Sequence, residues 1–209
     1  MNQEMKKIEE PEVIIIKKEK EIDRIISDHV IFAMVAGAIP VPVLDIAAVT
    51  AIQLDMIRQL AEKYDMSFDL EVGKSLVSSI FASSVGTTVG RAGASFVKSI
   101  PGIGTVLGIS SQVALAGITT FAVGNLFNLH FSQGNPLVSF NFKTVKELFD
   151  ELLKKGKDFV DERANEVKIN EDVLKKQTAI IIKDMSKSNI INKDDAKKIL
   201  NFFKTDGDL

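Results

Sequence analysis

Few residues in this chain have the types and spacing that nucleotide chemistry needs. The string VGKS at 72–75 resembles the end of a phosphate-binding loop, but that loop also needs a glycine where this chain has Phe68. The run from Gly102 to Gly108 is rich in glycine, yet its spacing differs from that of a dinucleotide fingerprint and no strand pattern precedes it. We therefore predict no nucleotide site in this chain.

Catalytic and metal-binding constellations are also missing from the sequence. The two histidines, His29 and His130, lie far apart, and no local cluster supplies the further ligands that a metal ion needs. The chain contains no cysteine, which excludes thiol nucleophiles, zinc–thiolate sites and disulfides. No serine lies in a G-x-S-x-G turn. We predict that the protein is not an enzyme and has no cofactor.

Two ionisable residues stand out because the centre of the chain carries so few charges. Asp45 follows Pro42 in the first turn of an expected helix, where a carboxylate is favoured by the helix N-terminus. Arg91 lies in a glycine-rich apolar segment. Since an unpaired charge is costly in a low-dielectric interior, Asp45 and Arg91 form a candidate buried ion pair.

Charge divides the chain into three parts. Lys and Arg number 26 and Asp and Glu 28, so the net charge of −2 argues against nucleic-acid binding. Most charges lie before residue 29 or after residue 142, and none occurs from Ser99 to Phe142. We predict a flexible charged lead over 1–16, an apolar four-helix domain over 17–132 and a charged three-helix tail over 143–209.

The apolar pattern predicts an all-α protein. We expect central helices over about 17–38, 42–64, 70–99 and 101–131, which form two apolar helical hairpins. Each hairpin turns at an Ile-Pro corner, and the corner residues are Pro40, Pro42, Pro101 and Gly102. In the tail, an apolar stripe from Val145 to Val160 predicts an amphipathic helix. A second tail helix is expected over 171–187, and a third begins after the N-cap Asn192.

Small residues recur along the third and fourth helices. Glycine costs about 1 kcal/mol in an exposed helix interior, whereas in lipid it lets helix backbones approach closely. The pattern predicts a glycine-zipper type of helix–helix packing. Its residues are Ala82, Gly86, Gly90, Gly93, Gly104, Gly108, Gly117 and Gly124.

The uncharged run from Ile103 to Phe127 exceeds the roughly 20 residues that cross a bilayer. The preferred interpretation is a membrane-associated protein, with lysines after residue 142 favouring a cytoplasmic tail. Serines and threonines make the third helix rather polar, so the alternative is a cytoplasmic soluble bundle that binds a lipid or other apolar ligand between its hairpins.

The central region resembles a bacterial family, domain of unknown function 697, over about residues 29–128. The matching positions, in order, are Ile39, Pro40, Asp45, Thr50, Ala51, Ile52, Gln53, Gly90, Arg91, Ile100, Pro101 and Gly102. The first corner departs from the pattern, since Val41-Pro42 stands where a second proline followed by glycine is expected. The resemblance implies a helical, membrane-predicted module that occurs alone or fused to Era-like GTPase domains. It implies no catalytic residue.

Together these observations predict a non-enzymatic accessory or scaffold protein associated with the bacterial inner membrane. Membrane lipid is its expected partner, and the apolar stripe of the first tail helix would bind a GTPase or a second copy of the chain. Nucleic acid is not expected as a partner.

Overall fold

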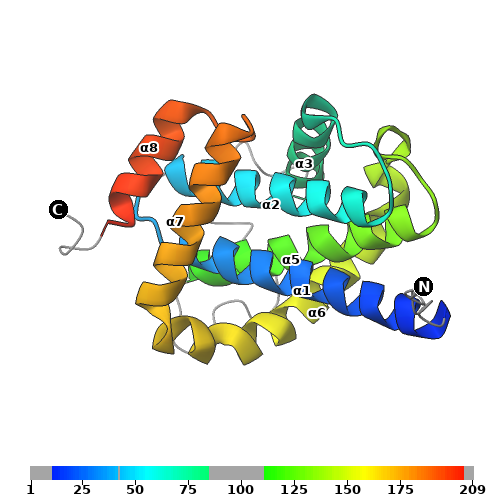
Figure 1. The fold of residues 1–209 in the computed structure, drawn as a ribbon, viewed down its shortest axis with the longest axis horizontal. Helices are drawn as coiled ribbons and strands as arrows, with labels where there is room; N and C mark the ends of the chain where they lie inside the picture. Colours follow the sequence, from blue (N-terminus) through cyan, green and yellow to red (C-terminus); the bar gives the residue numbers. More distant parts are fainter. Residues whose placement is uncertain (1–10, 42, 85–110, 205–209) are drawn as a thin grey trace, which may run out of the picture.

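The computed structural model describes residues 11–41, 43–84 and 111–204, and the regular elements in these ranges are helices joined by short connections (Figure 1). The elements are α1 (Pro11–Ala36), α2 (Leu44–Lys63), α3 (Leu70–Ser84), α5 (Ser111–Ser132), the 3-10 helix η2 (Leu137–Ser139), α6 (Phe142–Ile169), α7 (Glu171–Lys187) and α8 (Lys193–Phe202). The described ranges contain no strand, which confirms the predicted all-α class.

Helix α5 is the core of the fold. It packs against α1, α2 and α6, and Figure 1 shows it running alongside α1 and α2 in the middle of the molecule. A helix that is apolar on every side must be covered by protein or by lipid. The segment Gln112–Ser132 is long and apolar enough to cross a membrane, and 67% of its most apolar stretch is buried inside this fold.

The amphipathic face of α6 is covered by the chain itself. Phe149, Leu152, Leu153 and Val160 are buried in the apolar core, and α6 packs along α5. The prediction that the stripe from Val145 to Val160 binds a partner is therefore wrong. The stripe is covered because α5 has no polar face of its own and packs against the apolar face of α6.

Helices α7 and α8 complete the same core. Helix α7 crosses α1 and α2 in Figure 1 and contacts both, while α8 contacts α2 and α7. Leu174, Ile182, Ile199 and Phe203 are buried together with residues of α1 and α2. The apolar core is thus continuous across the predicted boundary between central domain and tail. The first helix also begins at Pro11, inside the predicted lead.

Helix ends follow the expected local chemistry. Asn192 caps α8 by accepting a hydrogen bond from the backbone nitrogen of Asp195 at 2.8 Å, as predicted, and Asn141 caps α6 in the same way through Lys143. Between α1 and α2 the chain passes through Pro40, and Val43 precedes α2 with a φ of 80°. A β-branched residue rarely adopts that backbone conformation.

Candidate functional site

A buried polar cluster joins α1 to α2. His29 is 3% exposed, and its Nδ1 donates to the carbonyl oxygen of Ile25 at 2.7 Å because a carbonyl can only accept. Its Nε2 lies 3.3 Å from Oδ2 of Asp55, which is 6% exposed. Two ionisable side chains from different helices therefore meet inside an apolar core.

Neighbouring residues of α2 complete the cluster around Asp55. Arg58 donates from Nε and from its terminal nitrogen to Oδ1 of Asp55, at 3.1 and 2.6 Å, and Gln59 donates to Oδ2 at 2.8 Å. Burial raises the pKa of Asp55, but the hydrogen bonds and positive charge of His29 and Arg58 outweigh it and lower that pKa to about 2. The carboxylate stays ionised at neutral pH.

The cluster ties α1 to α2 inside the core. His29 and Asp55 are both covered by the fold. Two further polar contacts tie α2 to α5: Gln53 donates to Oγ1 of Thr120 at 3.1 Å, and the Tyr64 hydroxyl donates to Asn128 at 2.7 Å. Polar bonds at fixed positions along α2 set its register against both neighbours.

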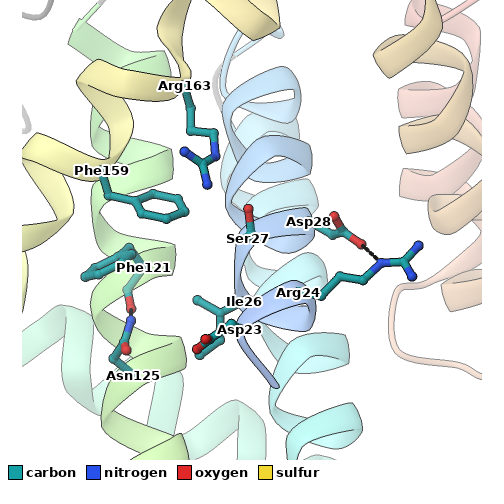
Figure 2. A pocket seen from close by; sticks show the side chains of 9 residues that line it. All are labelled: Asp23, Arg24, Ile26, Ser27, Asp28, Phe121, Asn125, Phe159 and Arg163. Carbon is teal, nitrogen blue, oxygen red and sulfur yellow. Dashed lines mark hydrogen bonds and ion pairs between the residues drawn. The ribbon is translucent and has the colours of Figure 1, made fainter. Parts of the chain in front are cut away.

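An open pocket of about 420 Å³ lies where α1, α5 and α6 meet (Figure 2). The rings of Phe121 and Phe159 form one wall, with centroids 4.9 Å apart. Arg163 extends from α6 over the Phe159 ring, 4.3 Å from its centroid, and Ser27 lies opposite on α1. The volume of the pocket falls in the range of small-molecule sites. The lining residues are Asp23, Arg24, Ile26, Ser27, Asp28, Phe121, Asn125, Phe159 and Arg163.

Of the candidate ion pair, Arg91 lies outside the described residues and Asp45 lies within them. Asp45 is buried at the start of α2, and one carboxylate oxygen accepts from the backbone nitrogen of Ile46 at 2.7 Å. The other accepts from the side-chain amide of Gln112 on α5. In the described part of the chain, Asp45 therefore links the first turn of α2 to the first turn of α5.

Two of the predicted packing glycines lie in described parts of α5, at helix crossings. A Cβ placed on Gly117 would be 2.7 Å from Cγ of Met34 and 2.8 Å from Cγ2 of Val160, and one on Gly124 would be 2.9 Å from Sδ of Met56. Their partners are thus α1, α2 and α6. Gly86, Gly90, Gly93, Gly104 and Gly108 lie outside the described residues, as do Pro42, Pro101 and Gly102, and the Ala82 side chain does too.

The remaining motifs have structural roles. The VGKS string lies in the first turns of α3, where Gly73 faces the ring of Phe68, so it forms no phosphate-binding loop. His130 lies near the end of α5, with Nε2 3.0 Å from the carbonyl oxygen of Pro136. Among the described residues, no group of three His, Asp or Glu side chains could hold a metal ion.

Sequence reasoning missed the His29–Asp55 cluster and the pocket. The only local signal for the cluster is the string Asp55, Arg58, Gln59 and Glu62, whose spacing also fits an ordinary solvated helix face. Nothing in the sequence indicates that Asp55 faces a histidine of another helix.

Comparison with known proteins identifies the family. The model of the family described as Domain of unknown function (DUF697) matches residues 3–158, which is most of the chain. The chain belongs to this family. The match extends beyond residues 29–128, so the DUF697 region includes all of α1 and more than half of α6.

The chain is also similar to a bacterial membrane protein. Magnetosome membrane protein 22 of Magnetospirillum gryphiswaldense is 38% identical over 136 residues, which cover 65% of this chain and 70% of the relative. No solved structure matches the chain.

Proposed function

We propose that this chain is a non-enzymatic accessory or scaffold protein that acts at a membrane. The observation that carries the proposal is helix α5, an uncharged helix of spanning length, in a chain that is 38% identical to a protein named as a membrane protein. Asp55 and His29, the described groups closest to a catalytic pair, are buried and hydrogen-bonded, which supports the non-enzymatic part.

An exposed apolar corner gives the fold a second means of membrane contact. Val41, Val43 and Ile46, beside Pro40, are 43%, 71% and 66% exposed at the start of α2. The neighbouring carboxylate of Asp45 is buried and hydrogen-bonded. Among the described residues from Pro40 to Ile46, this corner presents apolar surface without a free charge, which favours contact with lipid.

The proposal includes the bacterial inner membrane as the location and a cytoplasmic tail. Lysines of α6 support this orientation, since basic residues next to apolar segments favour the cytoplasmic side. They are Lys143, Lys146, Lys154, Lys155 and Lys157. We also propose a partner for the chain, either a separate GTPase or a second copy of the chain. The GTPase rests on the sequence resemblance to modules that are fused to GTPase domains.

Membrane extraction tests this function. The untagged chain is expressed in bacteria, and membranes are sedimented at neutral pH and then washed with alkaline carbonate. We expect the chain to sediment at neutral pH. Retention after carbonate indicates that α5 spans the bilayer, and release by carbonate indicates contact through the surface. A chain that stays in the soluble fraction throughout contradicts the proposal.

The apolar corner supplies a matched comparison for the same assay. Replacing Val41, Val43 and Ile46 by serine removes exposed apolar surface without opening the core, so sedimentation with membranes should fall while thermal unfolding stays within a few degrees. The control replaces three other exposed apolar residues, Val138, Ile169 and Ile180. Equal loss in both variants would show that the corner has no special part in membrane contact.

The burial of α5 favours a second candidate, a soluble bundle that binds an apolar ligand. A core helix of a soluble protein can pass the same length and composition test as a membrane span. For this candidate we expect a soluble, monodisperse protein whose organic extract contains lipid. Mass spectrometry of that extract distinguishes it from the membrane-associated form.

A further inference from the structure

The pocket between α1, α5 and α6 contains a guanidinium whose donors are not used. The Glu162 and Glu166 carboxylate oxygens nearest Arg163 both lie 3.9 Å away, beyond hydrogen-bond distance. Within the described part of the chain, no group accepts a hydrogen bond from Arg163. Its stacking on Phe159 holds the planar group in place over the pocket, so an entering anion would meet a positioned donor.

The opposite end of the pocket is acidic. Asp23 lies one helical turn before Ser27 on α1, so both side chains lie on one face of that helix. The carboxylate of Asp23 has no partner among the described residues. Figure 2 shows Arg24 and Asp28 paired with each other on the side of α1 away from the two phenylalanines, and that pair is 3.5 Å apart.

We propose that this pocket binds a small zwitterion with a phosphate beside a primary ammonium, as in an ethanolamine phosphate. The phosphate accepts hydrogen bonds from Arg163 and from the Ser27 hydroxyl. The ammonium group donates to Asp23 and to the side-chain oxygen of Asn125, whose nitrogen already donates to the backbone of Phe121. The short carbon linker lies against the Phe121 ring.

The charges of the pocket favour a zwitterion over a simple ion. Asp23, Glu162 and Glu166 repel a bare phosphate, and Arg163 repels a bare ammonium. A ligand that carries both charges meets an opposite charge at each end of the pocket. The apolar wall of Phe121 and Phe159 excludes water from one side of the ligand, which strengthens both contacts.

The same chemistry has two sources, a phosphatidylethanolamine headgroup and a soluble phosphoethanolamine. The lipid source rests on the proposed function, because only a protein at a membrane meets that headgroup at high local concentration. The soluble source is independent of it.

Soluble probes test the pocket first. The full chain is titrated with O-phosphoethanolamine and with inorganic phosphate, and amide chemical shifts are followed by NMR. We expect O-phosphoethanolamine to bind more tightly and to shift resonances of the α1, α5 and α6 residues that line the pocket. Equal binding of the two probes, or shifts elsewhere, would overturn the proposal.

Single substitutions then separate the two charges. Arg163→Gln should weaken the binding of both probes about tenfold or more, since it removes charge-assisted hydrogen bonds. Asp23→Asn should weaken O-phosphoethanolamine and strengthen inorganic phosphate, because Asp23 attracts the ammonium group and repels the phosphate. Asp23 is exposed, so this variant tests the pocket even if Arg163→Gln unfolds. Lys154→Gln, an exposed change on α6, is the control and should alter neither affinity.

Vesicles distinguish the two sources. Sedimentation is compared with vesicles of phosphatidylcholine alone and with vesicles that contain phosphatidylethanolamine, for the parent chain and for Arg163→Gln. Preference for phosphatidylethanolamine that Arg163→Gln abolishes assigns the lipid source, and a bound soluble probe without this preference assigns the soluble source. If the parent binds neither O-phosphoethanolamine nor phosphatidylethanolamine preferentially, the pocket proposal fails. In that case, sedimentation with both vesicle types would still support membrane association.

Discussion

Replacing Asp55 by asparagine should destabilise the fold by about 2 kcal/mol at pH 7. The change keeps the shape of the side chain but removes the charge that Arg58 and His29 surround. The pKa of Asp55 is lowered from 3.8 to about 2 in the folded chain. Each pKa unit corresponds to about 1.4 kcal/mol, so the ionised carboxylate contributes roughly 2 kcal/mol of folding free energy.

The pH dependence gives this prediction its sharpest form. A carboxylate with a lowered pKa stabilises the fold above its unfolded pKa of about 3.8, and that stability is lost as pH falls through about 2. The difference between parent and Asp55→Asn that is measured at pH 5 should therefore shrink by roughly half at pH 3, which lies below the unfolded pKa of Asp55.

Urea unfolding followed by circular dichroism measures these free energies. Asp150→Asn is a suitable control, because Asp150 forms an exposed pair with Lys146 at 2.9 Å and such pairs contribute less than about 1 kcal/mol. A loss for Asp55→Asn no larger than that of the control, or a loss that does not shrink at pH 3, would refute the reasoning about a buried ionised cluster.

Three further predictions concern packing and backbone conformation, each measured as a free energy of unfolding. Thr120→Val should cost about 1–3 kcal/mol by leaving the buried Gln53 amide unpaired, whereas the double change with Gln53→Leu should recover most of that loss. Gly117→Ala should cost about 1–3 kcal/mol, and Gly124→Ala less, because Gly117 faces a stiff valine and Gly124 the flexible end of a methionine. Val43→Gly should stabilise by about 1 kcal/mol, since it relieves a positive φ at an exposed position. A stabilising effect of Thr120→Val or of Gly117→Ala, or a destabilising effect of Val43→Gly, would contradict the corresponding argument.

Local chemistry made much of the fold predictable. The end of α2 at Lys63, the range of α7 and the Asn192 cap follow from residue spacing and end signals that act within one or two turns. The amphipathic face of α6 was equally clear. Its partner was not, because an apolar stripe looks the same whether another molecule or α5 covers it.

The candidate site depends on contacts between distant parts of the chain. His29 and Asp55 meet only because α1 and α2 pack at one particular rotation, and the spacing within either helix does not determine that rotation. The pocket is a stronger case, since Ser27, Phe121 and Arg163 come from three helices. Sequence reasoning can place each residue on a helix face, but it cannot determine which faces meet.

The central place of α5 has a consequence for synthesis of the chain. Helix α5 leaves the ribosome before α6, the helix that covers one of its sides. At typical elongation rates the 28 residues of α6 take roughly one to six seconds to make. During that interval an uncharged helix of spanning length is exposed without its cover, and any factor that recognises nascent apolar segments competes with α6 for it. The rate of translation through α6 can thus influence whether α5 is delivered to a membrane or enclosed by its own chain.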